Sequence, residues 1–270
     1  MEDTMKQMRL RGIVIRLLIM SAFIATALPA AARTDKPPTA QETLYERQPE
    51  PAARQITVGV LIFPGFEMLD AYGPMEMWGT LKHAPAKVWG GEEKRVGVRL
   101  VTIAAKRGEI PSNQGPKTMA DFSYDNAPPL DFLVVPGGLG VLPLLKDPAT
   151  MNWLRAQAGK AGIVMSVCNG ASLLAAAGIL DDRPATTNKM AFHPSTAPGP
   201  KVKWVKKARW VDDGTVVTSS GVSAGMDMSL AVISRLYGKD IGAWLERVTE
   251  YDAHRDPSWD PFAAKAGLVE

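Results

Sequence analysis

The stretch AGIVMSVCNGASLLAAAG, residues 161–178, decides the fold of this chain and contains its only cysteine. The apolar run 163–167 predicts a buried parallel strand, and the Ala- and Leu-rich run after Gly170 predicts a helix. Cys168 therefore lies at a sharp turn between strand and helix, where the first N–H groups of the helix face its side chain. Because the start of a helix carries partial positive charge, this position predicts a thiolate rather than a thiol.

Two roles are open for Cys168. A lone cysteine is often a small buried apolar residue without chemistry. A strained turn, however, needs neighbours that are small or that tolerate a left-handed backbone, and Asn169 and Gly170 both do. We therefore expect a nucleophile at Cys168.

The composition predicts a single α/β domain without a nucleic-acid partner. The chain has 270 residues, 46% hydrophobic and 22% charged, which is enough to bury one substantial core. Its net charge is only +3, which does not favour nucleic-acid binding. A basic run at 201–209 alternates with apolar residues and predicts the solvent-exposed face of a strand. Its basic members are Lys201, Lys203, Lys206, Lys207 and Arg209.

Residues 1–32 predict a secretory signal peptide. They combine a basic start, an apolar run at 17–28 and small residues at 30–32 that fit a cleavage site. A single membrane anchor is the alternative, but the apolar run is shorter than the roughly 20 residues that span a bilayer. We expect export to a bacterial periplasm and no stable membrane anchor. With one cysteine, an exported chain forms no internal disulfide, so Cys168 is either inert or chemically active.

Residues 33–55 predict a disordered linker, because prolines stand among polar residues with no hydrophobic period. Residues 56–270 predict one domain of alternating strands and helices, hence a parallel sheet covered on both faces, with ligands at the carboxyl ends of its strands. In its first helix, Pro74 is tolerable only near the first turn. The expected strands are 56–63, 96–104, 131–135, 163–167, 202–211 and 215–219, of which the last two form a hairpin or strand pair. The expected helices are 66–81, 148–160, 225–237 and 240–251, and a turn-rich excursion covers 106–121.

Two features are expected beside Cys168 at that edge of the sheet. Asp70 follows the first strand, and an ordinary helix N-cap is its alternative role. Since an ionised carboxylate would repel a thiolate, we expect a protonated Asp70 that shares its proton with the sulfur and acts as general acid and base. Gly137 and Gly138 follow a buried strand and predict either a plain loop or backbone N–H groups that stabilise a developing negative charge.

No cofactor or metal is expected. The three histidines, His83, His193 and His254, have no metal-ligand spacing. The sequence Gly138-Leu139-Gly140 lacks the third glycine of a dinucleotide site and does not follow the first strand.

Six groups of short motifs lie between about Ile56 and Glu250. They are Ile62-Phe63-Pro64, Leu69-Asp70 with Gly73-Pro74, Val135-Pro136-Gly137-Gly138, Ser166-Val167-Cys168 with Gly170, Ala177-Gly178-Ile179-Leu180 with Ala185-Thr186-Thr187, and Ser223-Ala224-Gly225-Met226-Asp227. Together they resemble the ThiJ/PfpI superfamily. The resemblance implies a class I glutamine-amidotransferase-like fold, which is a flavodoxin-like parallel sheet sandwiched by helices, and a homodimer.

Within that superfamily the chain is most similar to isonitrile hydratases and to the sensor domains of AraC-type regulators. The resemblance to the hydratases makes Asp70 and Cys168 the reacting pair. It departs from them at Asn169, where they have threonine, and Asn188 stands where many relatives have a histidine. Because asparagine cannot act as a base, a Cys-His dyad is not expected; His193 is a possible substitute, with a structural role as the alternative.

These residues support two classes of function. The first is an enzyme in which Cys168 attacks a small electrophilic substrate, Asp70 moves the proton, and the N–H groups near Gly138 and Asn169 stabilise the developing charge. Gly137, Asn188 and His193 are the candidate pocket residues. Hydration of an isonitrile is the leading reaction, and glyoxalase, deglycase or amidase activities are alternatives.

The second class is a non-catalytic domain that binds a small molecule or senses oxidants through reversible oxidation of Cys168. A DNA-binding regulator is not expected, because only 19 residues follow Tyr251, too few for a helix-turn-helix domain.

Overall fold

The computed structural model describes residues 54–270. The predicted signal peptide at 1–32 and residues 33–53 of the predicted linker lie outside the described residues. The first strand begins at Arg54, two residues before the predicted start of the domain.

A seven-stranded sheet forms the centre of the domain and confirms the predicted α/β class with a flavodoxin-like parallel sheet. The strand order is β10-β11-β7-β6-β1-β2-β5, and every neighbouring pair is parallel except β10 with β11. The strands β6 and β7 are buried throughout, as expected for central parallel strands. The strands are β1 (Arg54–Leu61), β2 (Val96–Ala104), β5 (Phe122–Ser123), β6 (Phe132–Val135), β7 (Ile163–Ser166), β10 (Trp210–Asp212) and β11 (Val216–Ser219).

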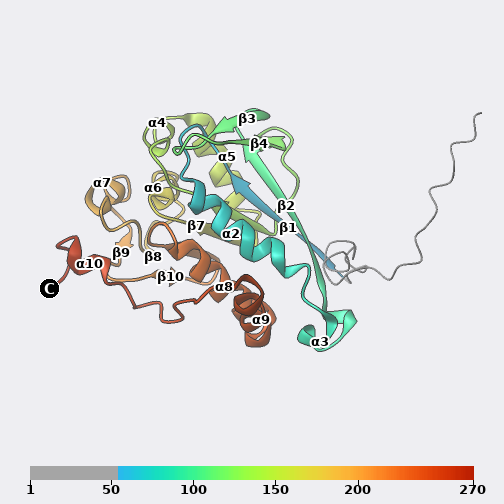
Figure 1. Ribbon diagram of the computed structural model, residues 1–270. Helices are drawn as coiled ribbons and strands as arrows, with labels where there is room; N and C mark the ends of the chain where they lie inside the picture. The colour runs from blue at the N-terminus through green and yellow to red at the C-terminus, as the bar shows by residue number, and fades with distance from the viewer. Residues whose placement is uncertain (1–53) are drawn as a thin grey trace, which may run out of the picture. The chain divides into compact units, whose positions relative to one another are not determined.

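Helices cover both faces of this sheet. On one face α2 packs against α8, and α8 packs against α9; α5 and α6 lie on the opposite face (Figure 1). The side chain of Asp147 caps α5 by accepting the N–H of Thr150 at 2.9 Å. The helices are α2 (Met68–Leu81), α3 (Ala86–Trp89), α4 (Val141–Leu144), α5 (Pro148–Ala158), α6 (Gly170–Ala176), α7 (Phe192–Thr196), α8 (Ala224–Tyr237), α9 (Lys239–Thr249) and α10 (Phe262–Lys265), with a 3₁₀ turn at Glu92–Lys94.

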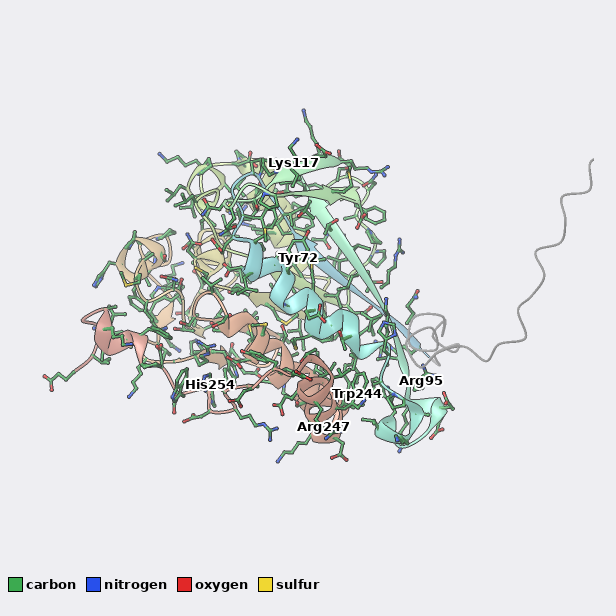
Figure 2. All side chains as sticks on the ribbon, in the orientation of Figure 1. Tyr72, Arg95, Lys117, Trp244, Arg247 and His254 are labelled. Atoms are coloured by element: carbon green, nitrogen blue, oxygen red, sulfur yellow. The ribbon has the colours of Figure 1, made fainter. Side chains whose placement is uncertain are left out.

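The predicted turn-rich excursion at 106–121 contains an antiparallel hairpin, β3 (Gly108–Pro111) with β4 (Lys117–Ala120). Its strands are short and largely exposed, so they lack the hydrophobic alternation that identifies a strand in a sequence. The hairpin contacts α2, because the hydroxyl groups of Tyr72 and Thr118 are hydrogen-bonded at 2.8 Å. Figure 2 labels Tyr72 on α2 and Lys117 on the hairpin. The excursion is therefore an ordered arm beside the first helix.

The predicted strand at 202–211 is too long, but its predicted pairing with 215–219 is confirmed at its end, where β10 pairs antiparallel with β11. Only Lys203–Trp204 (β9), which pairs with Pro184–Ala185 (β8), and Trp210–Asp212 (β10) are strands there. The basic run is consequently not one face of a strand: Arg209 is buried, and its guanidinium bonds the carboxylate of Asp227 at 2.7 and 2.6 Å.

The expectation for Pro74 was also wrong. Pro74 lies in the interior of α2, which continues through it to Leu81. Because proline has no N–H, the main-chain oxygen of Asp70 loses its usual helical donor at this point.

No helix within residues 54–270 is long and apolar enough to cross a membrane.

We predict that Arg209→Met lowers the free energy of unfolding by about 3–5 kcal/mol, because it leaves the carboxylate of Asp227 buried without its cation. Denaturant unfolding measures the change. The control is Lys117→Met, which removes an ion pair with Glu109 that is exposed on both sides and should leave the midpoint unchanged. Equal unfolding midpoints for the two variants would contradict a stabilising role for the buried ion pair of Arg209 and Asp227.

Candidate active site

Four neighbouring strands bring the candidate residues to one edge of the sheet. The order β11-β7-β6-β1 places their carboxyl ends side by side. Cys168 follows β7, Gly137 follows β6, Gly221 follows β11, and Asp70 lies in the first turn of the helix after β1. This is the position at which open α/β sheets bind ligands.

The backbone of Cys168 has the strained conformation expected of a nucleophile elbow. Its φ angle is +57°, in the left-handed region that residues with a side chain rarely adopt. Two hydrogen bonds hold it: its N–H donates to the main-chain oxygen of Ser220 at 2.7 Å, and its own oxygen accepts the hydroxyl of Thr187 at 2.9 Å. Gly170 lets the helix start close by, because a Cβ there would lie 2.3 Å from the oxygen of Val135.

Asp70 is a buried residue of α2 and not an N-cap. Its Oδ2 accepts the N–H of Gly137 at 2.9 Å, while among residues 54–270 its Oδ1 has no N–H or O–H partner. Burial raises the pKa of this carboxyl well above its usual value, and the charge of Glu67 raises it further. The Gly137 N–H and the thiol of Cys168 oppose this shift, which shows that the thiol is close to the carboxyl. The direction favours the protonated Asp70 that the sequence predicted.

The prediction of a thiolate at Cys168 is wrong, because the structure favours the thiol. Burial raises the pKa of the Cys168 thiol, and the charge of Asp70 raises it further. The N–H of Asn169 and the side chain of Asn188 act in the opposite direction but are outweighed. The helix start does favour the thiolate, as predicted, but desolvation of the sulfur is the larger effect. Cys168 is therefore a thiol at rest and needs a partner that takes its proton.

The predicted charge-stabilising groups bind each other. The N–H of Gly138 donates to Oδ1 of Asn169 at 2.7 Å, and Nδ2 of Asn169 donates to the oxygen of Gly138 at 3.1 Å. The main-chain N–H of Asn169 faces the sulfur of Cys168 and is the donor already aimed at the reacting atom. Glycine is required at 138, because φ is +127° and a Cβ would lie 2.3 Å from the oxygen of Gly65.

The two remaining pocket candidates lie in different places. Asn188 is at the site: its Oδ1 accepts the N–H of Ala191 at 3.0 Å, and its side chain interacts with the sulfur of Cys168. His193 is not: α7 turns its side chain to solvent, so it cannot replace the missing histidine. A hollow of about 330 Å³ lies beside Asn188. It is lined in part by Leu69, Met190, Gly221, Val222 and Phe262.

Three groups at the site were not identified from the sequence. Glu67 raises the pKa of both Asp70 and Cys168, Thr187 fixes the oxygen of Cys168, and Ser220 accepts its N–H. Thr187 lies in the motif Ala185-Thr186-Thr187, but its hydroxyl contact depends on tertiary structure. Among residues 54–270, no group of His, Cys, Asp and Glu side chains is arranged to hold a metal ion.

Known proteins are similar to this chain in sequence and in fold. The sequence profile of the DJ-1/PfpI family matches residues 56–235. An isonitrile hydratase from Pseudomonas putida is 32% identical over 220 residues, which are 80% of this chain and 87% of that protein. The HTH-type transcriptional regulator GbdR of Pseudomonas aeruginosa is 26% identical over 193 residues, 71% of this chain but only 51% of the regulator. A crystal structure of a ThiJ/PfpI family protein from Pseudomonas syringae superposes with a TM-score of 0.65 at 21% identity, covering 86% of this chain and 91% of the other.

We predict that Asp70→Asn stabilises the protein at alkaline pH. Because the pKa of Asp70 is raised on folding, its neutral form contributes stability that is complete below the unfolded pKa of about 4 and is lost as the pH rises through the folded pKa. The variant should therefore melt at a higher temperature than the parent at pH 9, by about 2–4 °C per kcal/mol, with a smaller difference at pH 5. A difference that does not depend on pH would contradict this assignment.

Proposed function

The chain belongs to the DJ-1/PfpI family, and from that membership we propose that it is an isonitrile hydratase-like enzyme in which Cys168 is the nucleophile and Asp70 transfers the protons. The observation that carries the proposal is the strained, positive-φ backbone of Cys168 beside a buried carboxyl with a raised pKa. The 32% identity to an isonitrile hydratase supports the choice of reaction.

In the first step the sulfur of Cys168 attacks the terminal carbon of the isonitrile. The neutral carboxyl of Asp70 delivers its proton to the same carbon and takes the thiol proton in exchange, which gives an enzyme-bound thioformimidate, R–N=CH–S–Cys. Because Asp70 takes the thiol proton as the sulfur attacks, the reaction does not require a free thiolate, which the raised pKa of Cys168 disfavours. Oδ1 of Asp70, which has no other hydrogen-bond partner among the described residues, is the oxygen available for this transfer.

In the second step water adds to the carbon of the thioformimidate. Asp70 takes a proton from the water and returns it to the nitrogen, so the intermediate is R–NH–CH(OH)–S–Cys. The carbon–sulfur bond then breaks, the hydroxyl proton returns to sulfur through Asp70, and an N-substituted formamide leaves. The sum is R–NC plus water to R–NH–CHO, with the enzyme restored. The N–H of Asn169, which faces the sulfur, favours sulfur as it leaves with negative charge.

The hollow beside Asn188 favours a substrate with an apolar substituent. Leu69, Met190 and Phe262 line it and are 41%, 85% and 43% exposed. Large apolar side chains left in contact with water at a concave surface are typical of a site that binds an apolar group.

The alternatives within the family explain less of the site. An amidase or protease of the Cys-His type needs a base that Asn188 cannot supply. A glyoxalase or deglycase activity uses the same cysteine and acts on carbonyl carbon, so substrate screening separates it from hydration. A redox-sensing domain needs a thiol that ionises easily, and burial of Cys168 raises its pKa instead.

We further propose that the enzyme acts as a homodimer on a small molecule in a bacterial periplasm, without nucleic acid as a partner. The N-terminal residues 1–32, with their basic start and apolar run, support export. Expression of the full chain in a bacterium, followed by N-terminal sequencing of the periplasmic fraction, should give a protein that begins near Arg33. Recovery of the unprocessed chain in the cytoplasm would contradict export.

Purified protein should hydrate an isonitrile with an apolar substituent to its formamide, measured by mass spectrometry of the product. Cys168→Ala should abolish turnover, and Asp70→Asn should lower kcat by about 10²–10⁴-fold through loss of the proton transfer. The matched control is Asp181→Asn, which removes an exposed carboxylate paired with Lys201 and should keep full activity. Turnover that survives in Cys168→Ala would overturn the mechanism, and absence of turnover in the parent would overturn the reaction.

A further inference from the structure

The C-terminal segment reaches the candidate site. Phe262 lines the hollow beside Asn188. Upstream of it, the N–H of His254 donates to the carboxylate of Asp227 at 3.0 Å, and the oxygen of Pro257 accepts the N–H of Arg209 at 2.7 Å (Figure 2 labels His254). The segment is thus attached at several points to the domain, although it lies beyond residues 56–235 that match the family profile.

A buried ion pair joins this segment to the loop beside Cys168. Nζ of Lys189 lies 3.3 Å from Oδ2 of Asp260, and the two side chains are 2% and 1% exposed. The ammonium also donates to the hydroxyl of Thr186 and, at 3.0 Å, to the main-chain oxygen of Thr187. Asp260 is the only carboxylate that pairs with this ammonium among the described residues.

The same loop holds the nucleophile on two sides. Thr187 donates its hydroxyl to the oxygen of Cys168 at 2.9 Å. Asn188, the next residue, places its amide beside the sulfur of Cys168: a Cβ on Gly221 would lie 2.3 Å from Nδ2 of Asn188 and 3.2 Å from Sγ of Cys168. The amide lowers the pKa of the thiol. Lys189 follows directly, so its ammonium ties down the peptide that presents Asn188.

We propose that Lys189 and Asp260 are positioning residues, which hold the amide of Asn188 against the sulfur of Cys168 from the C-terminal segment. The inference rests on the proposed function only in taking Cys168 as the nucleophile. Removing two charges from water is an expensive way to gain stability, and buried pairs of this kind can serve to select one conformation. Neither side chain touches the reacting atoms, so both act through Asn188.

The test is the rate at which iodoacetamide alkylates the full chain at a fixed pH of 8, where Cys168 is the only thiol. Asn188 lowers the pKa of the thiol, whereas Asp70 and Glu67 raise it. Asn188→Ala should therefore raise this pKa and slow alkylation. Asp260→Asn should slow it in the same direction, by about threefold or more, which corresponds to half a unit of pKa. The double variant Asn188→Ala/Asp260→Asn should be no slower than Asn188→Ala alone, since both changes remove one interaction.

A purely structural role for the ion pair gives the opposite result. If the ion pair only anchors the segment, its loss would expose the sulfur, and Asp260→Asn would be alkylated faster than the parent. If the two residues act independently, their effects on the alkylation rate would add in the double variant. Either outcome, or an unchanged alkylation rate with a lowered melting temperature, overturns the proposal. If Asp260→Asn does not fold, Lys189→Met/Asp260→Asn removes both charges together and should show the same slowing. The control is Asp181→Asn, from the exposed pair with Lys201, which should alkylate as the parent does. Alkylation needs no substrate, so the two proposals can fail separately. If the variants show the expected alkylation rates but the protein does not hydrate isonitriles, the proposed reaction is rejected and the positioning role of Lys189 and Asp260 is retained.

Discussion

The constraint on which the rest of the site depends is the left-handed backbone at Cys168. A residue with a side chain does not hold φ near +57° without support from its surroundings. Here the support comes from two segments that follow other strands: Ser220, after β11, accepts the N–H, and Thr187, after β8, donates its hydroxyl to the oxygen. The small residue Gly170 lets α6 begin against the end of β6, where a side chain would collide. The strain is thus maintained by segments far apart in the sequence.

The electrostatics of the site follow from its burial. Desolvation is the largest influence on both the carboxyl of Asp70 and the thiol of Cys168, and it raises both pKa values. Two acids that resist ionisation and lie close together form a system in which a proton moves between them more readily than it leaves for solvent. Such a pair suits an addition reaction, in which each proton taken from sulfur or water is returned to the substrate.

Local sequence signals predicted the parts of the molecule that depend on local structure. The apolar run 163–167, the helix after Gly170 and the glycines after β6 were all identifiable, because burial and turn geometry restrict residue type at these positions. The charge state of Cys168 could not be predicted, since desolvation depends on the segments that cover it. The same holds for Arg209, whose partner Asp227 lies on another element, and for the mutual hydrogen bonds of Gly138 and Asn169. His193 was misplaced because the orientation of α7 is set by packing and not by spacing.

The positive φ at Cys168 also has a consequence for how the chain can change over evolutionary time. At a left-handed position glycine removes the steric penalty that every other residue carries, so a mutational path that improved folding alone would lead from cysteine towards glycine. Selection for stability and selection for the thiol therefore act in opposite directions on this one codon. In a lineage that no longer needs the thiol, replacement of Cys168 by glycine would be expected to raise thermal stability. Glycine at position 168 would then indicate that the thiol chemistry has been lost.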